Sequence, residues 1–159
     1  SVDISDVGSI VRIRSRCTRF IKIRFGSCML LIFRHPGPLF DAGIAAIVDV
    51  AIEESTAQPP RQLIYCRFPL NNGGGNESGV LRQTVQTVVD LLAVSTRVLV
   101  TCSAGISRAP TIAAFSLAAY LDQSPDMVIS RIVNTRSLAV NGVFWQDVAA
   151  IFSQIRRPV

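Results

Sequence analysis

The chain has 159 residues and a formal net charge of +5, from 16 basic and 11 acidic side chains. Hydrophobic residues make up 49% of the sequence and charged residues 17%, a balance that excludes a disordered protein and predicts one folded domain over residues 1–159. The longest uninterrupted apolar run, residues 28–33, is far shorter than the roughly 20 residues of a membrane-spanning helix. We therefore expect no membrane span.

Basic residues are concentrated near the start of the chain. Residues 1–36 hold seven Arg or Lys against two Asp, and this excess favours an anionic partner. The alternative is that these charges are the solvated faces of half-buried strands, since charged and apolar residues alternate over 11–14 and 21–25. No aromatic- and glycine-containing RNA motif accompanies them, so nucleic acid is not an expected partner.

Short apolar runs predict strands in the first two thirds of the chain. Six are predicted, at residues 11–14, 21–25, 29–33, 45–50, 63–68 and 98–101. The last three are mostly apolar, which is typical of parallel strands buried on both faces.

Helical spacing of apolar residues dominates the second half of the chain. It predicts helices over 80–92 and 109–121, one that starts at Pro125 after a Ser124 cap, and one over 142–155 after an Asn141 cap. Strands that alternate with helices predict an α/β fold with a mainly parallel central sheet flanked by helices. In such a fold, ligands gather at the carboxyl ends of the strands.

The cysteines and the single histidine do not form a metal-binding pattern. Cys17, Cys28, Cys66 and Cys102 contain no C-x-x-C pair, and His35 stands alone, so we expect no metal, no cofactor and a reducing, cytoplasmic location. Cys66 is a candidate for a disulfide with Cys102 under oxidation.

Residues 97–110 are the candidate segment for chemistry, because an apolar strand leads through a short turn into a buried helix. The five residues between Cys102 and Arg108 are small or include Gly105, so their amides are able to converge on an anion at the helix N-terminus. The same spacing at Cys28 and Arg34 encloses bulky residues and has no such ability. Arg108 would grip two oxygens of an oxyanion, and the positive field would favour the thiolate of Cys102.

Residues 98–110 resemble the phosphate-binding loop H-C-x-x-G-x-x-R-[ST] of the cysteine-dependent protein tyrosine and dual-specificity phosphatases. The resemblance covers about residues 37–155 and includes the segments 39–50 and 67–72, whereas residues 1–36 match poorly and are expected only to form strands. It implies the phosphatase fold, with Cys102 as nucleophile and Arg108 as phosphate clamp. The implied phosphate cradle is formed by the amides of Ser103, Ala104, Gly105, Ile106, Ser107 and Arg108.

The sequence departs from the family pattern at three positions. Thr101 replaces the usual His before the nucleophile, and Ala109 replaces the Ser or Thr after the arginine, although Ser107 is adjacent. Asn72 stands where the general-acid Asp is expected, and loss of a general acid costs on the order of 10²- to 10⁴-fold in rate. Glu77 is an alternative acid, and deamidation at Asn72-Gly73 would restore Asp at position 72.

The resemblance implies hydrolysis of phosphomonoesters through a thiophosphate on Cys102, at a reduced rate. Protein phosphotyrosine is the first expected substrate, and phosphoserine or phosphothreonine the second. The alternative is a phosphate-binding pseudophosphatase that acts as an interaction module, because the changes at positions 72, 101 and 109 weaken turnover more than binding.

Overall fold

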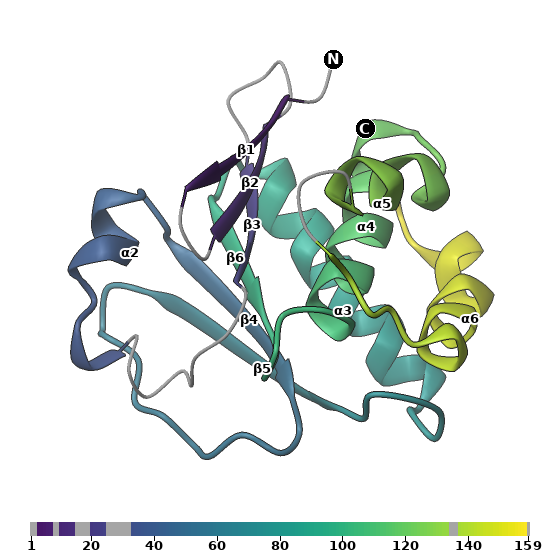
Figure 1. Cartoon of the computed structure of the whole chain (residues 1–159), viewed down its shortest axis with the longest axis horizontal. Coiled ribbons are helices and arrows are strands. Elements are labelled where there is room, and N and C mark those ends of the chain that lie inside the picture. The colour runs from purple at the N-terminus through teal and green to yellow at the C-terminus, as the bar shows by residue number, and fades with distance from the viewer. Residues whose placement is uncertain (1–2, 8–9, 15–19, 25–32, 134–136, 159) are drawn as a thin grey trace.

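A computed structural model describes residues 3–7, 10–14, 20–24, 33–133 and 137–158, with side chains from residue 33 onward (Figure 1). Its centre is a six-stranded sheet in the order β1-β2-β3-β6-β4-β5. The strands are β1 (Asp3–Val7), β2 (Ile10–Arg14), β3 (Phe20–Arg24), β4 (Ala46–Ala51), β5 (Ile64–Leu70) and β6 (Val98–Thr101). β3, β6, β4 and β5 pair in parallel, whereas β1–β2 and β2–β3 are antiparallel. The predicted α/β fold with a mainly parallel sheet is confirmed.

Five of the six predicted strands are present within about two residues of their expected bounds. The strand predicted at 29–33 is different: residues 29–32 lie outside the described residues, and Phe33 is helical, so its assignment to a strand is wrong. The helix α2 (Gly37–Asp41) follows, with Pro38 in its first turn, where the missing amide of proline is tolerated. The apolar side chain of Phe33 packs edge-to-face against Tyr65, with ring centroids 5.6 Å apart, which accounts for an apolar residue at this position.

The predicted helices are all present, as α3 (Ser78–Ala93), α4 (Arg108–Leu121), α5 (Pro125–Val133) and α6 (Gly142–Ile151). The last one stops earlier than expected and continues as the short 3-10 helix η1 (Phe152–Gln154). Both predicted caps are confirmed. Ser124 Oγ accepts a hydrogen bond from the Met127 amide at 3.2 Å, and Asn141 Oδ1 accepts from the Val143 and Phe144 amides at 3.0 and 3.1 Å.

Helices cover the two faces of the sheet unequally. α3, α4, α5 and α6 gather on one side, and α2 lies on the other (Figure 1). α4 is buried along almost its whole length, which explains its nearly continuous apolar sequence. Its Phe115 packs against Trp145 and Phe152, with ring centroids 4.7 and 5.3 Å apart. The start of α4 follows β6, whose carboxyl end shares one edge of the sheet with the carboxyl ends of β4 and β5.

Candidate active site

The loop of residues 102–108, here the Cys102 loop, joins β6 to α4. β6 is fully buried, and Cys102 at its end is only 6% exposed. Gly105 is buried and has a φ of +73°, a left-handed conformation that favours glycine, and it reverses the chain toward the helix. The Ala109 amide, in the first turn of α4, donates a hydrogen bond to Cys102 Sγ at 3.4 Å. The structure therefore holds the sulfur beneath a helix N-terminus.

The backbone amides of this loop are available to a ligand. In the described part of the chain, no oxygen accepts a hydrogen bond from the amides of residues 103–108. Consecutive unpaired amides at the N-terminus of a 14-residue helix present partial positive charge to an anion. The six predicted cradle residues are thus brought together around Cys102.

Arg108 connects the ends of three strands. Its side chain is 5% exposed, and its Nη1 donates to the Leu70 carbonyl at the end of β5 at 2.8 Å and to Glu53 Oε2 at 2.7 Å. Its Nη2 forms an ion pair with Glu53 Oε1. Burial alone lowers the pKa of Arg108, but the bond to Glu53 and the charge of Cys102 outweigh it, so the pKa is raised and the guanidinium stays charged.

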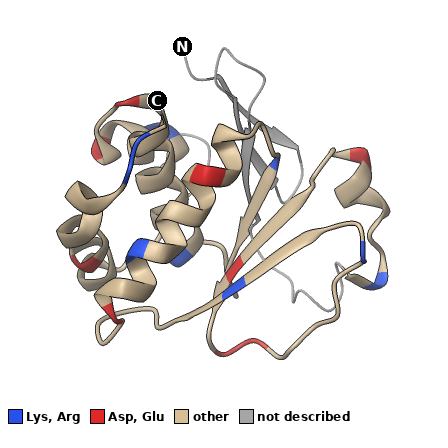
Figure 2. Cartoon of the chain, turned by 180° about the vertical axis from the view of Figure 1, so that it is seen from behind, with Lys and Arg blue, Asp and Glu red and all other residues tan. Residues whose placement is uncertain are grey.

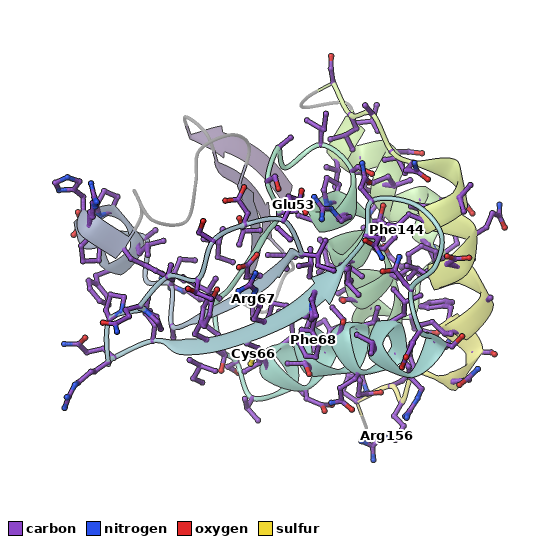
Figure 3. All side chains as sticks on the ribbon, turned by 90° about the horizontal axis from the view of Figure 1, so that it is seen from below. Glu53, Cys66, Arg67, Phe68, Phe144 and Arg156 are labelled. Atoms are coloured by element: carbon purple, nitrogen blue, oxygen red, sulfur yellow. The ribbon has the colours of Figure 1, made fainter. Side chains whose placement is uncertain are left out.

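Glu53 is a site residue that the sequence reasoning missed. It lies in the loop after β4, labelled in Figure 3, and its Oε1 also accepts a hydrogen bond from the Ser103 hydroxyl. The bond from Arg108 is the largest cause that lowers the pKa of Glu53, to about 2. The sequence signal that could have identified Glu53 is its position just after β4. The carboxyl end of β4 lies beside that of β6, at the edge of the sheet where ligands gather. Figure 2 shows this acidic stretch in red in the loop that follows β4.

Asn72 is placed against the Cys102 loop by a chain of hydrogen bonds. Ser107 Oγ donates to Asn72 Oδ1 at 2.7 Å, and the Asn141 amide donates to Ser107 Oγ at 3.0 Å. Asn141 Nδ2 also donates to the Asn72 carbonyl at 3.4 Å. Asn141 was predicted only as a helix cap, so its contact with this site was missed.

A second contact braces the Cys102 loop from the same side. The Ala139 amide donates to the Ile106 carbonyl at 3.1 Å. Together with the Asn141 amide on Ser107, it ties the segment before α6 to the second half of the Cys102 loop. The loop is therefore fixed both by α4, which follows it, and by a segment more than 30 residues away.

The loop of residues 71–77, here the Asn72 loop, is held by Asn76. Asn76 Oδ1 accepts from the Asn71 amide at 2.8 Å, and Asn76 Nδ2 donates to the carbonyls of Asn71 and Gly73 at 3.1 and 2.9 Å. Glu77 is the residue before α3 and lines a cavity of about 260 Å³ together with Pro69, Leu70, Asn71, Gly75, Asn76 and Val80. No residue of the Cys102 loop lines this cavity, whereas Asn72 accepts a hydrogen bond from Ser107 of that loop.

Polar residues behind the site fix the loop that carries Glu53. Asp49, in β4 beside Thr101 of β6, is 1% exposed and accepts from the Tyr65 hydroxyl at 2.8 Å and the Ala51 amide at 3.1 Å. Burial, followed by the bond to Asp49, raises the pKa of Tyr65. Arg67 Nη2 donates to the Glu54 carbonyl at 2.7 Å, which ties β5 to this loop (Figure 3).

The candidate disulfide between Cys66 and Cys102 does not fit the sheet. Cys66 is opposite Val48 in β4, and Val48 is opposite Val100 in β6, so two strand spacings separate the cysteines. At about 4.8 Å per spacing, the Cα atoms lie about 10 Å or more apart, beyond the roughly 7 Å limit for a disulfide. Burial also raises the pKa of the Cys66 thiol, which makes it less reactive.

No group of three or more His, Cys, Asp or Glu side chains in the described part of the chain is arranged to hold a metal ion. Likewise, no described helix has the length and apolar character needed to cross a membrane.

Sequence comparison places this chain in no family, because no family model and no curated protein matches it. Structure comparison does find similar proteins. Human DUSP28 superposes with a TM-score of 0.65 at 18% identity, over 82% of this chain and 91% of that one. DUSP15 gives a TM-score of 0.64 at 17% identity, over 94% and 86% of the two chains.

A third similar structure is the human tyrosine phosphatase-like serine/threonine/tyrosine-interacting protein, with a TM-score of 0.67 at 16% identity. The match covers 84% of this chain and 91% of that one. The chain therefore has the fold of the dual-specificity phosphatase structures.

Proposed function

We propose that the protein hydrolyses phosphomonoesters through a covalent intermediate on Cys102, in the cytoplasm, with phosphorylated proteins as partners. Phosphotyrosine is the first substrate class and phosphoserine or phosphothreonine the second. The observation that carries the proposal is the position of Cys102 Sγ, which accepts a hydrogen bond from the first turn of α4 and begins a loop of unpaired amides that ends at the charged Arg108.

In the first step, the Cys102 thiolate attacks phosphorus, the S–P bond forms and the ester P–O bond breaks. The amides of residues 103–108 and Arg108 stabilise the charge that spreads over the phosphoryl oxygens. In the second step, water attacks phosphorus, the S–P bond breaks, and phosphate and the thiolate are released. Arg108 is able to bind phosphate while it contacts Glu53, because its Nε donates no hydrogen bond within the described residues.

The leaving oxygen needs a proton in the first step, and Asn72 does not supply one. Its side chain is an amide, and its Oδ1 accepts a hydrogen bond from Ser107. A rate loss on the order of 10²- to 10⁴-fold is therefore expected for substrates with basic leaving groups. Aryl esters with acidic leaving groups should be affected least, because their leaving oxygen needs little protonation.

The alternative is a pseudophosphatase that binds a phosphorylated partner without turnover. Two features favour it: the amide at position 72 and the carboxylate of Glu53, which occupies both terminal nitrogens of Arg108. One of the similar structures is itself described as phosphatase-like and as an interacting protein. Binding without hydrolysis would use the same amides and the same Arg108.

Hydrolysis of an activated aryl phosphate by the wild type and by Cys102→Ser tests the proposal. We expect turnover that Cys102→Ser lowers by at least about 10³-fold, since removal of a catalytic nucleophile has effects of this size or larger. Cys66→Ser is the matched control and should keep full activity, because Cys66 lies two strands away. If the wild type shows no turnover but tungstate raises its Tm, the pseudophosphatase alternative is correct.

A further inference from the structure

We propose that Asn72 is a deamidation site, through which the chain acquires a carboxyl group beside the Cys102 loop after synthesis. The conversion itself depends only on the local structure. Its effect on rate rests on the proposed function, because an aspartate at position 72 would supply the proton that the amide does not. The modified residue would thus change a slow enzyme into a faster one.

The reaction needs no reagent other than water. The backbone nitrogen of Gly73 loses its proton and attacks Cγ of Asn72, so that a C–N bond forms and closes a five-membered imide. The bond from Cγ to Nδ2 breaks, and this nitrogen leaves as ammonia with the transferred proton. Water then opens the imide at either carbonyl, which gives aspartate or isoaspartate, and no group is oxidised or reduced.

The attacking group is accessible. Asn72 is exposed, and no described residue accepts a hydrogen bond from the Gly73 amide. A Cβ at Gly73 would meet no atom within 4 Å, so the space beside its Cα is open. Gly74 and Gly75 follow, and glycines allow the backbone rotation that ring closure requires.

The attacked group is activated by its neighbour in the Cys102 loop. Ser107 Oγ donates to Asn72 Oδ1 at 2.7 Å and itself accepts from the Asn141 amide at 3.0 Å, so the hydroxyl is polarised toward Asn72. As Gly73 adds to Cγ, negative charge develops on Oδ1. A hydrogen bond donor aimed at that oxygen stabilises the addition.

The other Asn-Gly pair of the sequence, Asn141-Gly142, serves as an internal control for deamidation. Gly142 is the first residue of α6, and Asn141 Oδ1 is fixed by the amides of Val143 and Phe144. Ring closure there would require the backbone at the start of α6 to leave its helical conformation, whereas Asn72 and Gly73 lie in a loop. We therefore expect Asn141 to remain an amide under conditions in which Asn72 converts.

The test is mass spectrometry of the full chain after storage at mildly alkaline pH. Trypsin places the two pairs in separate peptides, 68–82 and 137–156, and fragmentation distinguishes Asn72 from Asn71 and Asn76. We expect the deamidation mass shift to accumulate at Asn72 and not at Asn141, and to slow several-fold in Gly73→Ala and in Ser107→Ala. Equal conversion of both pairs, or conversion unaffected by Gly73→Ala, would overturn the proposal.

Activity of the same samples tests the consequence. Turnover of an alkyl phosphate should rise in proportion to the aspartate fraction in the wild type, reach the same fraction of the Asn72→Asp rate, and stay flat in Gly73→Ala. If Asn72→Asp is faster than the freshly purified wild type but stored protein does not gain activity as it converts, the inference is wrong and the proposed function stands. If Asn72→Asp shows no turnover at all, the proposed function falls, and the peptide masses alone decide the modification.

Discussion

The Cys102 loop and the Asn72 loop face each other across the site but are built differently. The first is largely buried, begins at a fully buried strand and ends in a helix that is almost entirely inside the protein. The second is largely exposed, contains three consecutive glycines and is held mainly by the side chain of Asn76. The residues that we propose for phosphate binding and nucleophilic attack thus lie where the core enforces the backbone, and the position proposed for the proton donor lies where it does not.

Arg108→Lys changes the Cys102 loop and should have the largest effect on kcat/KM among the variants below. Lysine keeps the positive charge but loses the planar fork that contacts Glu53, Leu70 and the ligand. We expect kcat/KM for an aryl phosphate to fall about 10²- to 10³-fold, as for removal of a donor to a developing oxyanion. Stopped assays measure this, and the Tm shift with tungstate should shrink in parallel. Arg82→Lys, on the exposed side of α3, is the control and should change neither value.

Asn72→Asp introduces a carboxyl group into the Asn72 loop. An acid at this position should raise kcat for an alkyl phosphate about 10²-fold and leave an activated aryl phosphate almost unchanged, because only the alkyl leaving group needs protonation. A pH profile of kcat should gain a descending limb at high pH, where the new acid ionises. Asn71→Asp places the same charge one residue earlier, and an equal gain from that control would argue for a general charge effect.

Asn141→Ala tests whether the two loops depend on each other through α6. It removes a cap that binds two amides and the bond to the Asn72 carbonyl, and it should cost about 1 kcal/mol of the free energy of unfolding. Ser124→Ala removes the cap of α5, far along the chain from the site, at a similar cost. Urea denaturation gives both values. Only Asn141→Ala should lower kcat, and an equal kcat in the two variants would separate α6 from the site.

Glu53→Gln should have the smallest effect on stability. The Glu53 side chain is 49% exposed, so loss of the ion pair with Arg108 should cost less than about 1 kcal/mol at neutral pH. The folded-state pKa of Glu53 is about 2, below its ordinary value of 4.5, so its stabilisation is fully present above pH 4.5 and is lost as the pH falls through 2. Unfolding by urea at several pH values should show wild type and variant converging over this interval. A constant difference down to pH 2 would contradict the assignment.

Most of the fold was predictable because it depends on local periodicity. The apolar runs of β4, β5 and β6 and the spacing in α3 and α6 report which residues are buried, and Ser124 and Asn141 cap helices through bonds to their own neighbours. Phe33 was assigned wrongly because an apolar residue near prolines packs equally well from a helix. Its partner Tyr65 is more than 30 residues away, beyond any local pattern.

The candidate site was predictable only in part, for the same reason. Cys102 and Arg108 lie within one turn, so small intervening residues were enough to bring them together. Glu53 reaches Arg108 because β4 lies next to β6 in the sheet, and strand order does not follow from strand patterns. The contact of Asn141 with Ser107 uses a backbone amide, which carries no sequence signal at all.

The amides of Ala139 and Asn141 both end on the Cys102 loop, so the last helix does not detach without releasing that loop. We therefore expect local unfolding of the C-terminal part to be coupled to the proposed anion site. By linkage, a ligand with affinity only for the closed loop stabilises α6 by RT ln(1 + [L]/Kd), although it makes no contact with that helix. Slower proteolysis of α6 would then report that a ligand occupies the Cys102 loop, to which the amides of Ala139 and Asn141 donate hydrogen bonds.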